Sequence, residues 1–383
     1  MNGTIYMPVG EVCSSISDTY REKKNMVTLI NTSDVLEGRV LNHERVPNSN
    51  LKGQFKKTFQ RDDILYSEIR PQNRRFAYVD FSPIDYIAST KLMVIRAKKD
   101  VVSPKYLYYF LKNSSTVAEL QLLAETRSGT FPQITFSEVA NLTIPVPSLA
   151  VQEVIVQTMQ CLEDKITCNE QINDNLADLL QTIYQERFVN DILAVNQGVL
   201  SDICSYSRDK VAVSELNIRT YFSTENMLSG KAGSTEATSL PTTSQTTACH
   251  KGDTLISNIR PYFKKIVYCE DNCGCSTDVL CFTPSQPRYS AYLFSTLYAD
   301  KFFAFMVAGS KGTKMPRGDK QQIMTYPVVL PSEEELAGFN TIASPLLEQI
   351  YSNRAENKRL SILRDTLLPK LMSGEIDVSA VQL

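Results

Sequence analysis

Four cysteines lie close together in the chain: Cys269, Cys273, Cys275 and Cys281. Cysteine thiolates at short spacing are common ligands of structural zinc. These four do not show the usual pairing of Cys-x-x-Cys motifs, so we expect free thiols and no metal site. The nine cysteines of the whole chain are scattered and odd in number, which indicates reduced thiols rather than a disulfide framework.

Other residue patterns that carry catalysis are scarce. The chain has only two histidines, His43 and His250, so no His-Glu-x-x-His metal motif is possible. It has no phosphate-binding Gly-x-x-x-x-Gly-Lys-Ser/Thr loop, no Gly-x-Gly-x-x-Gly loop, and no Pro-Pro dipeptide of the kind found where adenine methyltransferases hold a flipped base. Glu-x-Lys occurs at 22–24 and 163–165, but this fragment is too common to indicate a nuclease. We therefore expect a non-catalytic chain that binds no cofactor.

Basic side chains gather in three stretches. Residues 51–75 hold seven basic and three acidic residues, and residues 251–265 and 311–320 each hold four basic residues and one acidic residue. Lysine and arginine bind DNA phosphates, and Arg, Asn and Gln also read base edges. A single basic cluster can equally be a solvated face. The candidate DNA-binding residues are Lys52, Lys56, Lys57, Arg70, Arg74, Arg75, Arg127, Arg260, Lys264, Lys265, Lys311, Lys314 and Arg317.

Two of these arginines precede a proline, in Arg70-Pro71 and Arg260-Pro261. A proline favours an extended conformation in the residue before it. We therefore expect both arginines to be extended and to point in a defined direction. Either a buried ion pair or a DNA contact would use such a side chain, and the residues alone do not separate these roles.

The sequence contains a tandem duplication. Residues 28–38 recur at 220–230 and residues 63–71 recur at 253–261, in the same order, with an offset that falls from about 192 to about 184 residues. A basic pair follows three residues after each Arg-Pro. Repeats of this kind indicate two copies of one fold. Because the basic clusters recur at matched places, we favour a nucleic-acid interface over solvated faces.

A long helix is predicted after each copy. Residues 151–188 contain no Gly or Pro, and apolar residues recur there with the 4-3 spacing of a coiled coil. A shift of 184 residues gives a second such seam, and the same two seam positions hold asparagine in both: Asn169 and Asn173, then Asn353 and Asn357. A buried asparagine accepts only a partner that hydrogen-bonds to it. We expect an antiparallel pair in which Asn169 and Asn173 face Asn357 and Asn353.

Other features of the helices carry further expectations. Ser332 and Glu335 form a candidate capping box, and Pro345 should kink the second helix or mark its true start. Each helix would be about 55 Å long, too long to fold back on its own domain. Two separate amphipathic helices, or a seam that pairs between chains as a homodimer, are the alternatives. Shorter helices are predicted at 104–124 and 287–307.

Several motifs are similar to those of a known family. Residues 128–134 (Ser-Gly-Thr-Phe-Pro-Gln-Ile) lead to 142–149 (Leu-Thr-Ile-Pro-Val-Pro-Ser-Leu) and to Leu-Glu-Asp-Lys-Ile at 162–166. The end of the second helix reads Leu-Leu-Pro-Lys-Leu-Met-Ser-Gly-Glu-Ile at 367–376. This layout, over essentially the full chain, resembles the specificity (S) subunit of type I restriction–modification systems. Glu335 departs from the pattern, standing where the first boundary has Gln152.

The resemblance implies an α+β fold with two tandem target-recognition domains, each followed by a long helix, the two helices pairing as an antiparallel coiled-coil spacer. The expected parts are a first recognition domain at 1–148, its helix at 149–190, a second domain at 191–331, its helix at 332–376 and a tail at 377–383. Each domain would read one half of a bipartite double-stranded DNA target. Two methyltransferase (M) subunits would supply S-adenosylmethionine chemistry at adenine N6, and restriction (R) subunits would use ATP and Mg.

Composition agrees with this interpretation. The chain has 383 residues, 43% of them hydrophobic, and a net charge of −2, which is ordinary globular composition. No run of 18 apolar residues indicates a membrane span, and the N-terminal residues do not resemble a secretory signal, so we expect a cytoplasmic bacterial protein. A coiled-coil adaptor that does not bind DNA, and a stand-alone enzyme with an unfamiliar site, are the rival hypotheses.

Overall fold

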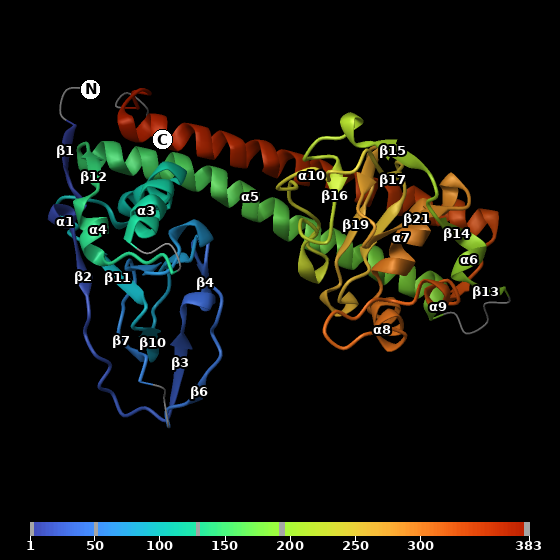
Figure 1. Cartoon of the computed structure of the whole chain (residues 1–383), viewed down its shortest axis with the longest axis horizontal. Coiled ribbons are helices and arrows are strands. Elements are labelled where there is room, and N and C mark those ends of the chain that lie inside the picture. The colour runs from blue at the N-terminus through green and yellow to red at the C-terminus, as the bar shows by residue number, and fades with distance from the viewer. Residues whose placement is uncertain (1–3, 50–52, 128–130, 191–195, 379–383) are drawn as a thin grey trace. The chain divides into compact units, whose positions relative to one another are not determined.

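The structure is a computed structural model that describes residues 4–49, 53–127, 131–190 and 196–378. It divides into two compact units (Figure 1). Unit 1 comprises 1–167 and 357–383, and unit 2 comprises 168–356. Each unit is a mixture of strands, short helices and one stretch of each long helix, which confirms the predicted α+β class. No helix in the described ranges is long and apolar enough to cross a membrane.

Unit 1 contains two four-stranded sheets. The first is antiparallel, in the order β2 (Cys13–Ile16), β11 (Leu92–Ala97), β8 (Ile64–Ser67) and β9 (Phe76–Tyr78). The second has the order β6 (Val46–Pro47), β3 (Met26–Ile30), β10 (Tyr86–Ser89) and β7 (Phe55–Lys57), with β10 parallel to β3. Two-stranded ribbons join β1 (Ile5–Pro8) to β12 (Thr143–Val146), and β4 (Val35–Leu36) to β5 (Arg39–Val40).

Unit 2 repeats the first sheet and three strands of the second. Its first sheet has the order β14 (Cys204–Tyr206), β21 (Val279–Pro284), β18 (Thr254–Ser257) and β19 (Ile266–Tyr268). Its second has the order β15 (Lys210–Ala212), β17 (Gln245–Cys249), β20 (Cys273–Cys275) and β16 (Tyr221–Phe222), with β16 parallel to β20. The ribbon is formed by β13 (Gln197–Val199) and β22 (Pro327–Val329). The duplication seen in the sequence therefore extends to the whole first sheet and to three strands of the second, β7-β10-β3 in unit 1 and β17-β20-β16 in unit 2. The fourth strand differs: β6 lies beside β3, whereas β15 lies beside β17.

The predicted short helices are each broken once. Unit 1 has α2 (Pro104–Lys112) and α3 (Ser114–Arg127), and unit 2 has α7 (Ser290–Tyr298) and α8 (Asp300–Ala308). Asn113 and Ala299, at the breaks, have ψ angles of 137° and 141°, outside the helical region. The remaining short helices are α1 (Val9–Val12), α4 (Phe136–Asn141), α6 (Leu200–Ile203) and α9 (Lys320–Ile323).

The long helices are α5 (Leu149–Tyr184), which continues as a π turn over Gln185–Val189, and α10 (Glu333–Ser373). The capping box at the start of α10 is confirmed: the Ser332 amide donates to Glu335 Oε2 at 2.8 Å, and the Glu335 amide donates to Ser332 Oγ at 3.2 Å. Because α10 begins at Glu333, Pro345 does not mark the start of the helix.

Within each unit the two helices run antiparallel. In unit 2, Asn353 Nδ2 donates to Asn173 Oδ1 at 2.9 Å, and Asn169 Nδ2 donates to Glu356 Oε2 at 2.7 Å. In unit 1, Asn357 Nδ2 donates to the carbonyl of Ile166 at 3.2 Å. From the first bond of unit 2 to the second, the residue number rises along α10 from 353 to 356 and falls along α5 from 173 to 169. This is the direction of an antiparallel pair.

Both long helices also belong to the core of each unit. In unit 1, Ile155 and Met159 of α5 and Leu371 of α10 are buried with the residues of the first sheet. In unit 2, Leu180 of α5 and Phe339 of α10 are buried in the corresponding core. The apolar seam is therefore used twice, for helix–helix contact and for helix–domain contact within a unit.

Candidate nucleic-acid interface

The two Arg-Pro segments form tight turns, and the expectation that their arginines are extended is wrong. Arg70 has φ 44° and Arg260 has φ 50°, both in the left-handed region. The Arg70 amide donates to the Pro132 carbonyl at 3.1 Å, and the Arg70 carbonyl accepts from the Asn73 amide at 2.9 Å. These tertiary and local bonds override the preference of a residue before proline.

Unit 2 builds the same turn. The Arg260 amide donates to the Pro316 carbonyl at 2.7 Å, and the Phe263 amide donates to the Arg260 carbonyl at 3.0 Å. In both units the proline opens a short 3-10 helix, η2 (Pro71–Asn73) or η6 (Pro261–Phe263). Pro132 and Pro316 occupy matched places in the duplication. The two copies thus share the same turn and the same backbone hydrogen bonds that hold it.

A second left-handed basic residue ends each turn: Arg74 at φ 52° and Lys264 at φ 51°. A non-glycine residue in this region costs on the order of 1–3 kcal/mol and persists only where the surroundings hold it. The left-handed conformation occurs at the same two places in both copies, on four basic residues.

The first residue of each basic pair is partly neutralised by an acidic side chain. Arg74 lies 3.4 Å from Glu37 and donates to the Lys112 carbonyl at 3.3 Å. Lys264 lies 3.0 Å from Asp300, which also takes Lys231 at 2.7 Å. The hydrogen bonds from these two lysines lower the pKa of Asp300.

The second residue of each pair anchors a neighbouring loop. Arg75 Nη1 donates to the Ser33 carbonyl at 3.0 Å, and Lys265 Nζ donates to the Thr224 carbonyl at 2.6 Å. Burial lowers the pKa of Lys265. Ser33 lies in the short 3-10 helix η1 (Thr32–Asp34) that follows β3, and Thr224 lies in the turn that follows β16, so the two copies use the second basic residue in the same way.

Some of the other candidate residues are bonded within the fold, and some are exposed without an ion pair. Lys57 donates to the carbonyls of Thr90 and Leu92, and three more pair with carboxylates: Arg127 with Glu138, Lys311 with Asp319 and Arg317 with Asp278. Within the described ranges Lys56, Arg70 and Lys314 are exposed and make no ion pair. Lys52 lies outside the described residues. The side chains best placed to meet a phosphate are therefore Lys56, Arg70 and Lys314.

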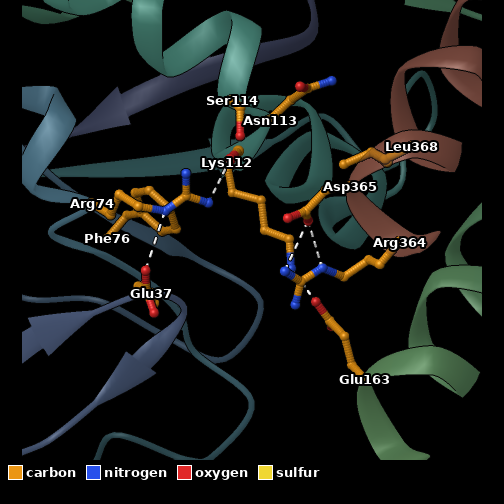
Figure 2. A pocket seen from close by; sticks show the side chains of 10 residues that line it. All are labelled: Glu37, Arg74, Phe76, Lys112, Asn113, Ser114, Glu163, Arg364, Asp365 and Leu368. Atoms are coloured by element: carbon orange, nitrogen blue, oxygen red, sulfur yellow. Dashed lines mark hydrogen bonds and ion pairs between the residues drawn. The ribbon is translucent and has the colours of Figure 1, made fainter. Parts of the chain in front are cut away.

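A polar cavity of about 100 Å³ lies beside the turn of unit 1 (Figure 2). Lys112, from the end of α2, is buried in it, pairs with Glu163 of α5, and lies 4.9 and 4.6 Å from the ring centroids of Tyr108 and Tyr109. Burial lowers the pKa of Lys112, against the opposing effect of Glu163. Arg74 also lines the cavity, so the network connects the turn to the long helices.

The cavity lining holds three cationic and three anionic side chains: Arg74, Lys112 and Arg364, and Glu37, Glu163 and Asp365. Figure 2 shows them paired with one another rather than directed at an empty centre. We interpret these ion pairs as a network that holds the turn and the end of α2 in place against the long helices of unit 1. One residue of this network could be found in the sequence, because Arg364 is a charged residue at a heptad position where an apolar residue is expected. Nothing in the sequence indicated that Lys112 would contact Glu163.

The clustered cysteines are buried in unit 2. Cys269 Sγ and Cys273 Sγ are 3.6 Å apart, and Cys281 Sγ donates to Asp253 Oδ2 at 3.2 Å. Hydrogen bonding to Cys273, with burial, raises the pKa of the Cys269 thiol. Across the described ranges, no group of His, Cys, Asp and Glu has the arrangement of a metal site.

Comparison with known proteins gives the class. Residues 6–177 match the type I restriction modification DNA specificity domain. The chain is 40% identical over 187 residues to the type I restriction enzyme HindI specificity subunit of Haemophilus influenzae, covering 49% of this chain and 41% of that protein. It is 23% identical over 365 residues to the MjaIX specificity subunit of Methanocaldococcus jannaschii, covering 78% of this chain and 76% of that protein.

Two solved structures show the same fold. The S subunit of the type I restriction–modification system from M. genitalium aligns with a TM-score of 0.55 at 16% identity, covering 99% of this chain and 98% of that chain. A chain of a type I restriction–modification complex aligns with a TM-score of 0.51 at 16% identity, covering 98% and 99%.

The first part of the molecule thus matches a DNA specificity domain, and the second half repeats the strand order of its first sheet. The chain is similar to the specificity subunits of type I restriction–modification systems, in agreement with the resemblance noted in its motifs. It spans about two-fifths of the length of the HindI relative.

Proposed function

We propose that this chain is the sequence-specific DNA-binding subunit of a type I restriction–modification complex, and that each unit contacts one half of a bipartite target. The observation that carries the proposal is the duplicated turn: both units hold an arginine in the same strained backbone conformation, Arg70 exposed and Arg260 half-buried. An exposed cation is available in each unit, Arg70 in the turn of unit 1 and Lys314 beside the Pro316 that attaches the turn of unit 2. A protein that reads two DNA half-sites needs a set of DNA-contacting residues in each of its two domains.

In this proposal catalysis belongs to partner subunits. Two methyltransferase subunits would transfer a methyl group from S-adenosylmethionine to adenine N6, and restriction subunits would use ATP and Mg. The sequence supports this division of labour, because it carries none of the nucleotide-binding or methyltransferase motifs. The recognition domains would be 1–148 and 191–331, the spacer helices 149–190 and 332–376, and the tail 377–383. A cytoplasmic location follows from such an assembly.

DNA binding by the chain together with its methyltransferase partner tests this proposal against the adaptor hypothesis. We expect the logarithm of the binding constant to fall linearly with the logarithm of salt concentration, because phosphate contacts release counterions. Substitution of Lys56, Arg70 or Lys314 by alanine should reduce the slope by about one for each phosphate contact removed.

The control is Lys99→Ala, because Lys99 already pairs with Asp62 at 2.7 Å. It should leave the slope close to its original value. An assembled complex that shows no salt-dependent binding to DNA would favour the adaptor hypothesis.

A further inference from the structure

The two turns share a backbone but present different side chains at their tips. Positions 72 and 73 of η2 are Gln72 and Asn73, whereas the matched positions of η6 are Tyr262 and Phe263. The residues on either side are alike in both copies, with Arg-Pro before the tip and a basic pair after it. The divergence is therefore confined to the part of the turn that solvent reaches.

These tip side chains have no structural task that the described residues show. Gln72 and Asn73 are exposed, and their side-chain amides make no hydrogen bond within the described ranges. Tyr262 and Phe263 are 51% and 39% exposed, with ring centroids 4.8 Å apart. Two large aromatic rings held together at the surface of a strained turn are costly in water and are typical of a contact surface.

The chemistry of each tip fits a different base. Glutamine and asparagine side chains donate and accept at once, and so form a bidentate pair with adenine N6 and N7 in the major groove. Apolar and aromatic side chains contact the 5-methyl group of thymine there. The flanking cations fit the adjacent phosphates: Arg70 in unit 1, and in unit 2 Lys314, two residues before the Pro316 that anchors the turn.

We propose that the tips of these two turns are specificity-determining elements, and that their divergence makes the two half-sites differ. Gln72 and Asn73 read an adenine in one half-site, and Tyr262 and Phe263 read a thymine methyl group in the other. This inference rests on the proposed function and assigns to named residues the base contacts it requires. The left-handed backbone of the basic residues at both ends of each turn holds the tip in place, and the Arg70 side chain remains available for a phosphate.

Base analogues in the DNA test each tip. The purified complex of this chain and its methyltransferase partner is bound to duplexes that carry the DNA motif methylated by that complex. Each adenine is replaced in turn by 7-deazaadenine, which lacks N7, and each thymine by deoxyuridine, which lacks the methyl group. With the unchanged chain, one deazaadenine position in one half-site should weaken binding about tenfold or more, and one deoxyuridine position in the other half-site severalfold. Gln72→Ala with Asn73→Ala should abolish only the first penalty, and Tyr262→Ala with Phe263→Ala only the second.

Each variant is compared with itself across the set of duplexes, so a general loss of affinity does not imitate the result. Ile84→Ala in unit 1 and Ile218→Ala in unit 2 are controls, because both side chains are exposed and lie outside the turns. They should keep both penalties. Penalties that persist in the tip variants would overturn the inference, as would tip variants that release the methyltransferase partner, which would make the tips a protein-docking surface. If the unchanged complex binds no split motif, the proposed function itself fails.

Discussion

Lys112 lies buried between two tyrosine rings and the carboxylate of Glu163. Charged groups are rarely buried unless they are paired, because the loss of hydration must be offset by a close partner. Tyr109 Oη also donates to Glu163 at 2.8 Å. This group attaches the end of α2 to α5 within unit 1, next to the Arg74 that closes the turn, so its effect reaches the candidate interface.

Glu163→Gln should destabilise the chain by about 3 kcal/mol, because it leaves the Lys112 ammonium buried without a counter-charge. Glutamine still accepts the bond from Tyr109, so the change isolates the charge. The chain has 18 tyrosines and no tryptophan, and urea unfolding followed by tyrosine fluorescence measures the effect. Lys99→Met, which breaks an exposed ion pair in the same unit, should cost less than about 1 kcal/mol. Equal effects of the two changes would contradict the assignment.

Glu270 gives a prediction for the pH dependence of stability in unit 2. Burial raises the pKa of Glu270 to about 7 from an ordinary value of 4.5, although Lys251 acts in the opposite direction. A carboxyl that holds its proton more tightly in the folded state contributes stability below pH 4.5, and this contribution is lost as the pH rises toward 7. The unchanged chain should therefore lose melting temperature between pH 5 and 7, and Glu270→Gln should flatten that dependence. A variant whose melting profile keeps the same slope would exclude Glu270 as the cause.

At the scale of elements, the long helices show what the sequence could and could not predict. The heptad seam, the matched asparagines and the capping box of Ser332 were all readable, because they depend on helical spacing along one chain. The breaks at Asn113 and Ala299 and the left-handed Arg70 were not, because bonds to distant residues decide them. Pro132, for example, closes the turn at Arg70 from 62 positions further along the chain.

The asparagine pair in α5 and α10 gives a prediction at this scale. Asn173→Leu should cost about 1–2 kcal/mol of unfolding free energy, because the buried Asn353 amide loses its acceptor. The double change Asn173→Leu with Asn353→Leu should recover most of that loss, since both polar groups are then gone. Gln349 Nε2, which donates to Asn353 Oδ1 at 2.8 Å, is on an exposed residue and can bond to water instead. Asn175→Leu, at an exposed position of α5, is the control and should stay within about 0.5 kcal/mol. A strictly additive double mutant would show that the two asparagines are not coupled.

At the scale of the whole molecule, both units contain the same strained turn with its basic residues. Both units have the same first sheet, the same turn and the same anchored basic pair, while the exposed tips differ. The duplication and the basic clusters were evident from the sequence, and they carried the nucleic-acid hypothesis. Which basic side chains remain available was not evident, because pairing with residues such as Asp278, Asp300 and Glu138 depends on the fold.

The most direct test of the account is genome-wide mapping of N6-methyladenine in cells with and without this chain, each carrying its methyltransferase partner. The account predicts that a single split motif, two short half-sites separated by a fixed gap, loses methylation when the chain is removed. An unchanged methylation pattern, with the partner expressed and active in both cells, would contradict the claim that this chain selects the DNA sequence.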